Sequence, residues 1–280
     1  MSVSRATSPR IAAAARCGIG RALRLLCSRP QGESPHRTQD GAVAAASARN
    51  SRGIVVKHLR IALGVALAAG AAGCDVGGGD VTAGANGAST VNGSVHVPAG
   101  LHSGKVDTVN GSIRIDENAT VASASTVNGS ISLGAHATAD SLDTVNGSIR
   151  LDSGAHVLRA VSTVNGRLTL ASAAEVGGQL RNVNGSIALR DAHVAQGLRT
   201  VNGNIDVRGS HIEGGIVVER SSGWFTWSFG LPRVVIGPGS VVQGDMRFER
   251  RVHLFVSDQA TVGAVIGATA QRFAGDSAPN

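Results

Sequence analysis

The strongest constraint on the fold is a six-residue stretch, Thr-Val-Asn-Gly-Ser-Ile, that occurs seven times with small changes. Its Asn residues are Asn92, Asn110, Asn128, Asn146, Asn165, Asn184 and Asn202. The steps between them are 18, 18, 18, 19, 19 and 18 residues. A fixed period of this length is typical of repeat proteins, in which each unit buries its apolar face only against its neighbours.

Each repeat contains short stretches with strand character. The Val before Asn-Gly and the residues two and four after Gly are apolar, as in Val109, Ile113 and Ile115. The alternation Ile113-Arg114-Ile115 predicts a strand with one buried and one solvated face. A weaker pattern, such as Ala155-His156-Val157, follows in each unit. We therefore expect two or three short strands per repeat, separated by Gly or polar turns.

Two all-β folds are compatible with this pattern. Asn-Gly between strand-forming residues is a strong signal for a two-residue hairpin, which would give a chain of antiparallel hairpins. The alternative is a single-stranded β-helix, a solenoid in which each unit of about 18 residues is one coil. We favour the β-helix, because the repeated Asn side chains could then form a hydrogen-bonded ladder along the stack. The 19-residue units would bulge at a turn, and seven coils would span roughly 34 Å.

Charge and cysteine are concentrated before the repeats. Residues 1–74 contain 11 Lys and Arg against 2 Asp and Glu, whereas residues 75–280 contain 15 against 17. The net charge of +7 therefore belongs to the N-terminal segment, and we expect no nucleic-acid partner for the repeats. The three cysteines are Cys17, Cys27 and Cys74, so the repeats can contain no disulfide.

The N-terminal segment divides into two parts. Residues 1–56 are interpreted as a disordered leader or an untranslated upstream region, with an Arg-rich transit peptide as the alternative; synthesis would then begin at Val55 or Val56. Residues 57–73 contain a basic start, a short apolar run and small residues, which is the pattern of a secretory signal. The apolar run is too short to span a bilayer as a helix.

The rest of the chain is divided by composition. We expect a Gly-rich tether at 74–88, a β-helix at 89–218, an aromatic loop at 219–231, two further β-coils at 232–270 and a frayed tail at 271–280. The aromatic loop holds Trp224, Phe225, Trp227 and Phe229. It is interpreted either as a cover over apolar coil ends or as a contact patch for a glycan, a membrane surface or a partner subunit.

Two resemblances extend this interpretation. The stretch Ala71-Ala72-Gly73-Cys74 resembles the bacterial lipoprotein signal, which implies lipidation of Cys74 and removal of everything before it. The Val-Asn-Gly-Ser-Ile units, with Ile236-Gly-Pro-Gly-Ser-Val-Val-Gln-Gly-Asp245, resemble an adhesin family of bacterial envelope proteins and the bactofilins, which are polymerising β-helix proteins. The resemblance covers about residues 89–265 and implies a right-handed coil.

No catalytic or metal site is predicted. Asp107, Asp143, Asp116 and Asp152 occur in only some units and are interpreted as solvated turn residues. His136, His156, His193 and His211 recur near equivalent positions and could form a column. Since no partnering carboxylate is evident in the pattern, we interpret them as surface residues rather than metal ligands. No phosphate loop, nucleophile elbow or zinc motif is present, and no cofactor is expected.

The sequence therefore predicts a non-catalytic cell-envelope lipoprotein with a structural or adhesin-like role. It would be anchored through Cys74 at the periplasmic side of the inner membrane or at the outer membrane. One alternative is a scaffold that polymerises end to end through its terminal coils, because unpaired strand edges must be capped or paired. Another is a protein that binds or cleaves polysaccharide.

Overall fold

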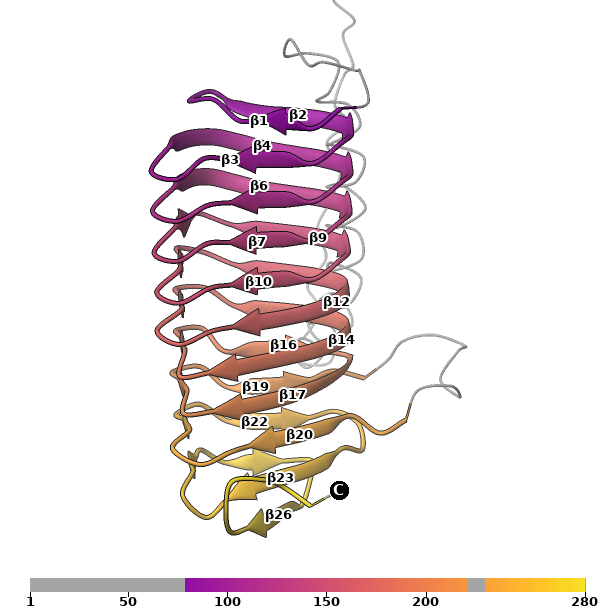
Figure 1. The fold of residues 1–280 in the computed structure, drawn as a ribbon. Helices are drawn as coiled ribbons and strands as arrows, with labels where there is room; N and C mark the ends of the chain where they lie inside the picture. The colour runs from indigo at the N-terminus through magenta and orange to yellow at the C-terminus, as the bar shows by residue number, and fades with distance from the viewer. Residues whose placement is uncertain (1–78, 221–229, 280) are drawn as a thin grey trace, which may run out of the picture. The chain divides into compact units, whose positions relative to one another are not determined.

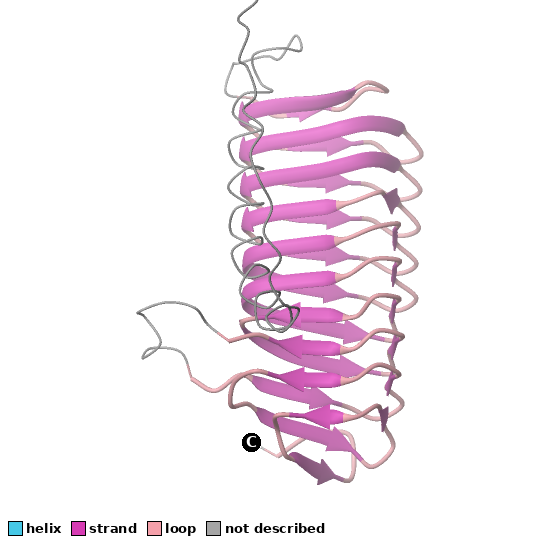
Figure 2. Ribbon diagram, turned by 180° about the vertical axis from the view of Figure 1, so that it is seen from behind, coloured by secondary structure: helices cyan, strands magenta, loops and turns pink. Residues whose placement is uncertain are grey.

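The structure, a computed structural model, describes residues 79–220 and 230–279, and these form a β-solenoid of about 10 turns (Figure 1). Strand pairings are parallel, apart from one isolated antiparallel bridge between Gly84 and Gly87. The described residues contain no helix, and so none that could cross a membrane (Figure 2). The predicted all-β solenoid with coils of about 18 residues is confirmed.

Each coil contributes strands to three stacked columns, which we call the Thr-Val face, the Ile face and the short-strand face. The Thr-Val face consists of β2 (Gly87–Asn92), β4 (His102–Asn110), β6 (Thr120–Asn128), β9 (Leu142–Asn146), β12 (Val161–Leu170), β14 (Leu180–Arg190), β16 (Leu198–Thr200), β19 (Ile216–Val218), β22 (Met246–Phe248) and β25 (Val265–Ile266). β12 and β14 continue through Asn-Gly onto the Ile face.

The other two columns complete each coil. The Ile face also contains β1 (Val81–Thr82), β3 (Val95–Val97), β5 (Ile113–Ile115), β7 (Ile131–Leu133), β10 (Ile149–Leu151), β17 (Asn202–Arg208), β20 (Arg233–Ile236), β23 (His253–Ser257) and β26 (Ala270–Phe273). The short-strand face contains β8 (Thr138–Ala139), β11 (His156–Val157), β13 (Glu175–Val176), β15 (His193–Val194), β18 (His211–Ile212), β21 (Val241–Val242) and β24 (Thr261–Val262).

The register places equivalent residues of successive repeats side by side. Asn110 pairs with Asn128 between β4 and β6, and Asn165 pairs with Asn184 between β12 and β14. Because these pairs are parallel, Asn-Gly lies at a corner of the coil and does not join two strands of a hairpin. The alternative of a chain of antiparallel hairpins is therefore wrong.

The core is aliphatic and runs through all the coils. The two apolar residues of each Ile-face strand point inward, and Ile113 and Ile115 are 0% and 1% exposed. On the Thr-Val face the inward residue is Thr, so Thr108 is fully buried while Val109 is half-buried. The Thr hydroxyl can be buried because it donates a hydrogen bond to the carbonyl of Gly93 in the neighbouring coil, at 2.9 Å.

The Gly of Asn-Gly is required by the close stacking of the coils. A Cβ atom on Gly129 would lie 1.9 Å from the carbonyl oxygen of Gly111, and one on Gly147 would lie 1.8 Å from that of Gly129. Neither residue has a positive φ, so the constraint at these corners is lack of space. The same dipeptide that is typical of hairpins is used here for close approach of two backbones.

The first 19-residue unit accommodates its extra residue at the corner after β11. Three residues separate Val157 from Val161, whereas two separate the equivalent Ala139 and Leu142. Leu158 lies in this longer corner and is 52% exposed. The pairing of Asn146 with Asn165 is preserved, which confirms that the insertion bulges at a turn without shifting the stack.

Two predicted boundaries are wrong. The segment 74–88 is not a tether throughout, because β1 pairs with β3 and Ala83 is 4% exposed. Its Gly residues serve partly for stacking, since Gly79 lies directly against Gly93. The tail is not frayed from residue 271: β26 pairs with β23, and Phe273 is 6% exposed.

The C-terminal coils continue the same three columns. β20, β21 and β22 form one coil, and β23, β24 and β25 form the next, as expected for 232–270. Arg233 Nη2 donates to the carbonyl oxygens of Ala278 (3.2 Å) and Pro279 (2.6 Å), so the tail is held against the Ile face. Ile205 pairs with Val234, so the chain between β17 and β20 includes the predicted loop. Residues 221–229 of that loop lie outside the described residues.

Candidate functional site

The predicted Asn ladder is present along one corner of the solenoid. In each of six steps, the Nδ2 of one Asn donates to the Oδ1 of the Asn in the preceding repeat, at 2.8 to 3.0 Å. The ladder joins Asn92, Asn110, Asn128, Asn146, Asn165, Asn184 and Asn202. At its last member, Asn202 Oδ1 accepts a hydrogen bond from Arg250. The ladder is a structural device, and each of its bonds contributes on the order of 1 kcal/mol.

The carboxylates do not occupy the positions expected of them. Asp107 and Asp143 lie within β4 and β9 rather than in turns, because the residue before the inward Thr must face outward from a strand. Asp107 accepts a hydrogen bond from Ser125 and lies 2.9 Å from Lys105 Nζ. Asp116 and Asp152 do lie just after strands, each paired with an Arg two residues earlier, Arg114 and Arg150.

A groove of about 600 Å³ lies at the corner that follows the Ile face. Its charged lining residues are Arg114, Asp116, Glu117, Arg150 and Asp152. Asp116 Oδ2 is 2.7 Å from His96 Nε2, and its Oδ1 is 3.0 Å from Arg114 Nε. The hydrogen bond from His96, together with that from Arg114, lowers the pKa of Asp116 below its ordinary value of 3.8. A general acid needs a raised pKa, so Asp116 suits an electrostatic role better than proton donation.

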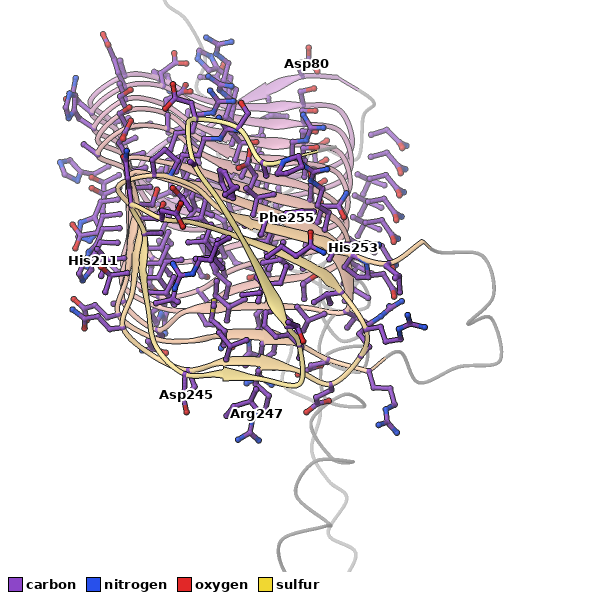
Figure 3. The ribbon with its side chains drawn as sticks, turned by 90° about the horizontal axis from the view of Figure 1, so that it is seen from below. Asp80, His211, Asp245, Arg247, His253 and Phe255 are labelled. Carbon is purple, nitrogen blue, oxygen red and sulfur yellow. The ribbon has the colours of Figure 1, made fainter. Side chains whose placement is uncertain are left out.

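The histidine column exists but differs from the predicted one. His156, Glu175, His193 and His211 stack in register on four successive strands of the short-strand face. His136 does not belong to it: the register places Thr138 in the column, and His136 has a φ of 56° in the preceding turn. His102 occupies the same column nearer the N-terminus, paired with Thr120. Viewed along the stack, His211 projects outward from the coils (Figure 3).

The interpretation of these histidines as lacking a carboxylate partner is wrong. His193 Nδ1 is 3.4 Å from Glu175 Oε1, and His193 Nε2 is 3.0 Å from Glu213 Oε1. Glu175 was missed because the 19-residue step shifts it against the Asn pattern. Aligning Ala155-His156-Val157, Ala174-Glu175-Val176 and Ala192-His193-Val194 would have placed it in the column.

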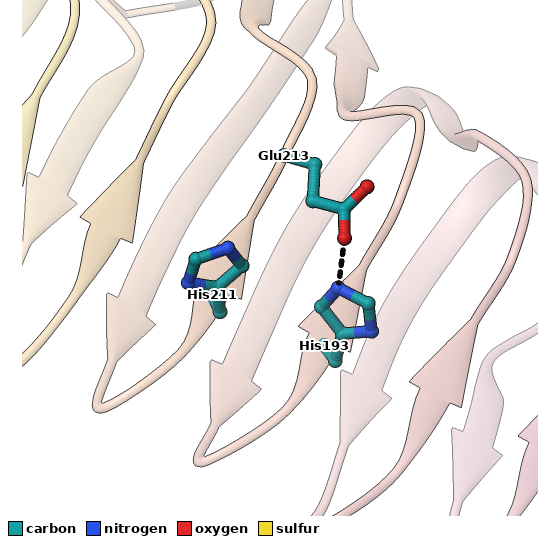
Figure 4. Close-up of side chains that lie close together, drawn as sticks. All are labelled: His193, His211 and Glu213. Carbon is teal, nitrogen blue, oxygen red and sulfur yellow. Dashed lines mark hydrogen bonds and ion pairs between the residues drawn. The ribbon is translucent and has the colours of Figure 1, made fainter.

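Three of these side chains could hold a metal ion. His193, His211 and Glu213 each offer one ligand atom, and these atoms all lie within 4.8 Å of one another (Figure 4). No such group was predicted from the sequence.

The C-terminal end of the stack presents strand edges. β24, β25 and β26 each pair with a strand on one side only within the described residues. Ile266 in β25 is 43% exposed, and Val262 and Val265 are half-buried. Such edges can accept a further strand.

Two predicted sites lie outside the described residues: the lipidation site Cys74, and the contact patch of Trp224, Phe225, Trp227 and Phe229. Comparison with protein-family models, with curated proteins and with solved structures found no match. The resemblance to adhesin-family proteins and bactofilins therefore stays a prediction, as do the lipoprotein signal and the handedness it implies.

Proposed function

We propose that this chain is a non-catalytic, lipid-anchored scaffold of the bacterial cell envelope, with a structural or adhesin-like role. The observation that carries the proposal is the unbroken register of the stack. Equivalent residues pair from β1 to β26, so each outward column presents repeated side chains about 4.8 Å apart. A regular surface of this kind suits display and multivalent contact more than the assembly of one catalytic centre.

The position of the solenoid relative to Cys74 supports the anchor. Gly79 already stacks against Gly93, and only four residues separate it from Cys74. A lipid on Cys74 would thus hold the first coil close to the membrane surface, at the periplasmic side of the inner membrane or at the outer membrane. The charge distribution agrees, because the basic residues that would be removed with the signal leave a nearly neutral body.

The anchor is tested by the mature N-terminus of the full chain expressed in a bacterium. Intact-mass spectrometry of the membrane fraction should give a chain that begins at a diacylated or triacylated Cys74. The variant Cys74→Ser should keep its signal uncleaved or be released from the lipid-rich phase after detergent partition. A mature chain that keeps residues before Cys74 in the wild type, or an unmodified Cys74, would contradict the proposal.

A second candidate is end-to-end association, which the one-sided edges of β24, β25 and β26 favour. Sedimentation of the Cys74→Ser chain over a concentration series distinguishes the two. Growth into long particles with concentration supports association through the ends. A constant monomer supports a scaffold that works through its lateral faces.

A further inference from the structure

We infer that His193, His211 and Glu213 form a binding site for a divalent transition-metal ion of the zinc class on the short-strand face. The site is built by the register of the solenoid. His193 and His211 are paired residues of β15 and β18, and Glu213 follows β18 by one residue. Parallel stacking fixes the two imidazoles about 4.8 Å apart at the backbone, which is a suitable base for two ligands of one ion.

The distances fit a tetrahedral ion closely enough for small side-chain rotations to complete it. Bonds of about 2.0 to 2.1 Å to nitrogen and oxygen place two ligand atoms of a tetrahedron roughly 3.3 Å apart. His193 Nε2 and Glu213 Oε1 are 3.0 Å apart, and the rings of His193 and His211 have centroids 5.6 Å apart. A rotation of the His211 ring would bring the whole set, now within 4.8 Å, to that spacing.

Glu175 gives independent support, because it occupies the position of a supporting carboxylate. A metal-bound imidazole usually donates its other ring N–H to a carboxylate, which fixes its tautomer and orientation. Glu175 Oε1 lies 3.4 Å from His193 Nδ1, on the side of the ring away from Nε2. The stack thus provides the sequence carboxylate, imidazole and metal ligand in three adjacent coils.

The surroundings fit a surface site with room for outside ligands. His193 has a side-chain exposure of 35%, and Glu213 of 49%. The Gln243 amide lies 3.1 Å from His211 Nε2, so an ion at that nitrogen would displace Gln243 or take its amide oxygen as a further ligand. Three protein ligands leave a position for water or for a donor group of another molecule.

The test uses the full chain with Cys17→Ser, Cys27→Ser and Cys74→Ser, since free thiolates would bind zinc themselves. Calorimetric titration with Zn²⁺ should give one equivalent bound. Titration with Co²⁺ should give the intense visible bands of a tetrahedral centre. Because the imidazoles must be unprotonated to bind, affinity should fall on acidification.

Variants separate ligands from bystanders. His211→Ala should abolish stoichiometric binding, and Glu175→Gln should weaken it about 10- to 100-fold, as expected for a residue that positions a ligand. His102→Ala, in the same column but away from the cluster, should bind like the parent. Thermal unfolding in the absence of metal checks that each variant is folded. Absence of stoichiometric Zn²⁺ binding in the parent, or equal binding by His211→Ala, would overturn the proposal.

Discussion

At the scale of single residues, the Gly of each Asn-Gly is fixed by distance rather than by dihedral angle. Replacement of Gly129 by Ala would place a Cβ 1.9 Å from the Gly111 carbonyl oxygen, a backbone atom that cannot rotate away. We expect Gly129→Ala to lower the free energy of unfolding by about 3 kcal/mol or more, as in severe overpacking. Denaturant unfolding followed by circular dichroism measures this directly.

The matched control for this substitution is Gly84→Ala. A Cβ on Gly84 would meet nothing within 4 Å, and its φ is not positive. We expect a change of less than about 1 kcal/mol, in the stabilising direction, because the unfolded chain loses freedom. Equal destabilisation by both substitutions would show that the stacking of Gly residues is not what limits position 129.

Asp116 gives the fold a dependence on pH that can be calculated in sign. Hydrogen bonds from His96 and Arg114 lower its pKa below 3.8 in the folded chain, so the folded state binds this proton less tightly than the unfolded state. The contribution of Asp116 to stability is therefore complete above pH 3.8 and is lost as the pH falls through the lowered value.

The variant Asp116→Asn isolates this contribution. We expect it to be less stable than the wild type at about pH 7 and to approach the wild type at about pH 3, where the carboxylate becomes protonated. Unfolding of both chains in urea at the two pH values makes the comparison. A difference in stability that stays constant over this range would contradict the assigned interactions.

At the scale of elements, period-two alternation predicted the Ile-face strands correctly but could not orient the Thr-Val face. Ile113 and Ile115 are both buried, as their alternation requires. Val109 is more apolar than Thr108, yet Thr108 is inside, because its hydroxyl bonds to the neighbouring coil and its small volume fits the corner. Hydropathy alone ranks the two residues the wrong way round.

The histidine column shows the same limit for sites. His156, His193 and His211 could be placed together from the sequence, but Glu175 and Glu213 could not be joined to them without the register. His136 was grouped with them by its Ala neighbours, although the turn before β8 removes it from the column. A one-residue insertion is enough to hide a neighbour in space from a pattern counted along the chain.

At the scale of the whole molecule, the repeat period was sufficient to predict the solenoid and its Asn ladder, because identical residues must meet when coils of equal length stack. The extent of the stack was underestimated, with seven coils expected and about 10 turns found. The additional coils lie in 79–88 and 230–279, where Val-Asn-Gly is absent and only the strand pairing identifies them.

The function depends on segments that the stack does not include. Cys74 and the aromatic residues Trp224 and Trp227 lie outside the described residues, so the anchor and the contact patch rest on sequence alone. The metal cluster, in contrast, lies entirely within the stack and can be tested independently of any anchor.

The central claim, that each repeat is one coil, is tested most directly by a distance between spin labels. The positions Ser112, Ser130, Ser148, Arg167 and Ser186 lie in one column, so Ser112 and Ser186 are four coils apart. Labels can be attached to Ser112→Cys and Ser186→Cys in the full chain without its three native cysteines, and pulsed electron spin resonance measures their separation.

One coil per repeat predicts a backbone separation of about 19 Å for this pair, at about 4.8 Å per coil. Two strands per repeat, as in a chain of hairpins, would give about 38 Å. The pair Ser112→Cys and Ser148→Cys should show half the separation of the longer pair and serves as the internal control. A distance near 19 Å with this ratio supports the in-register solenoid, and one near 38 Å contradicts it.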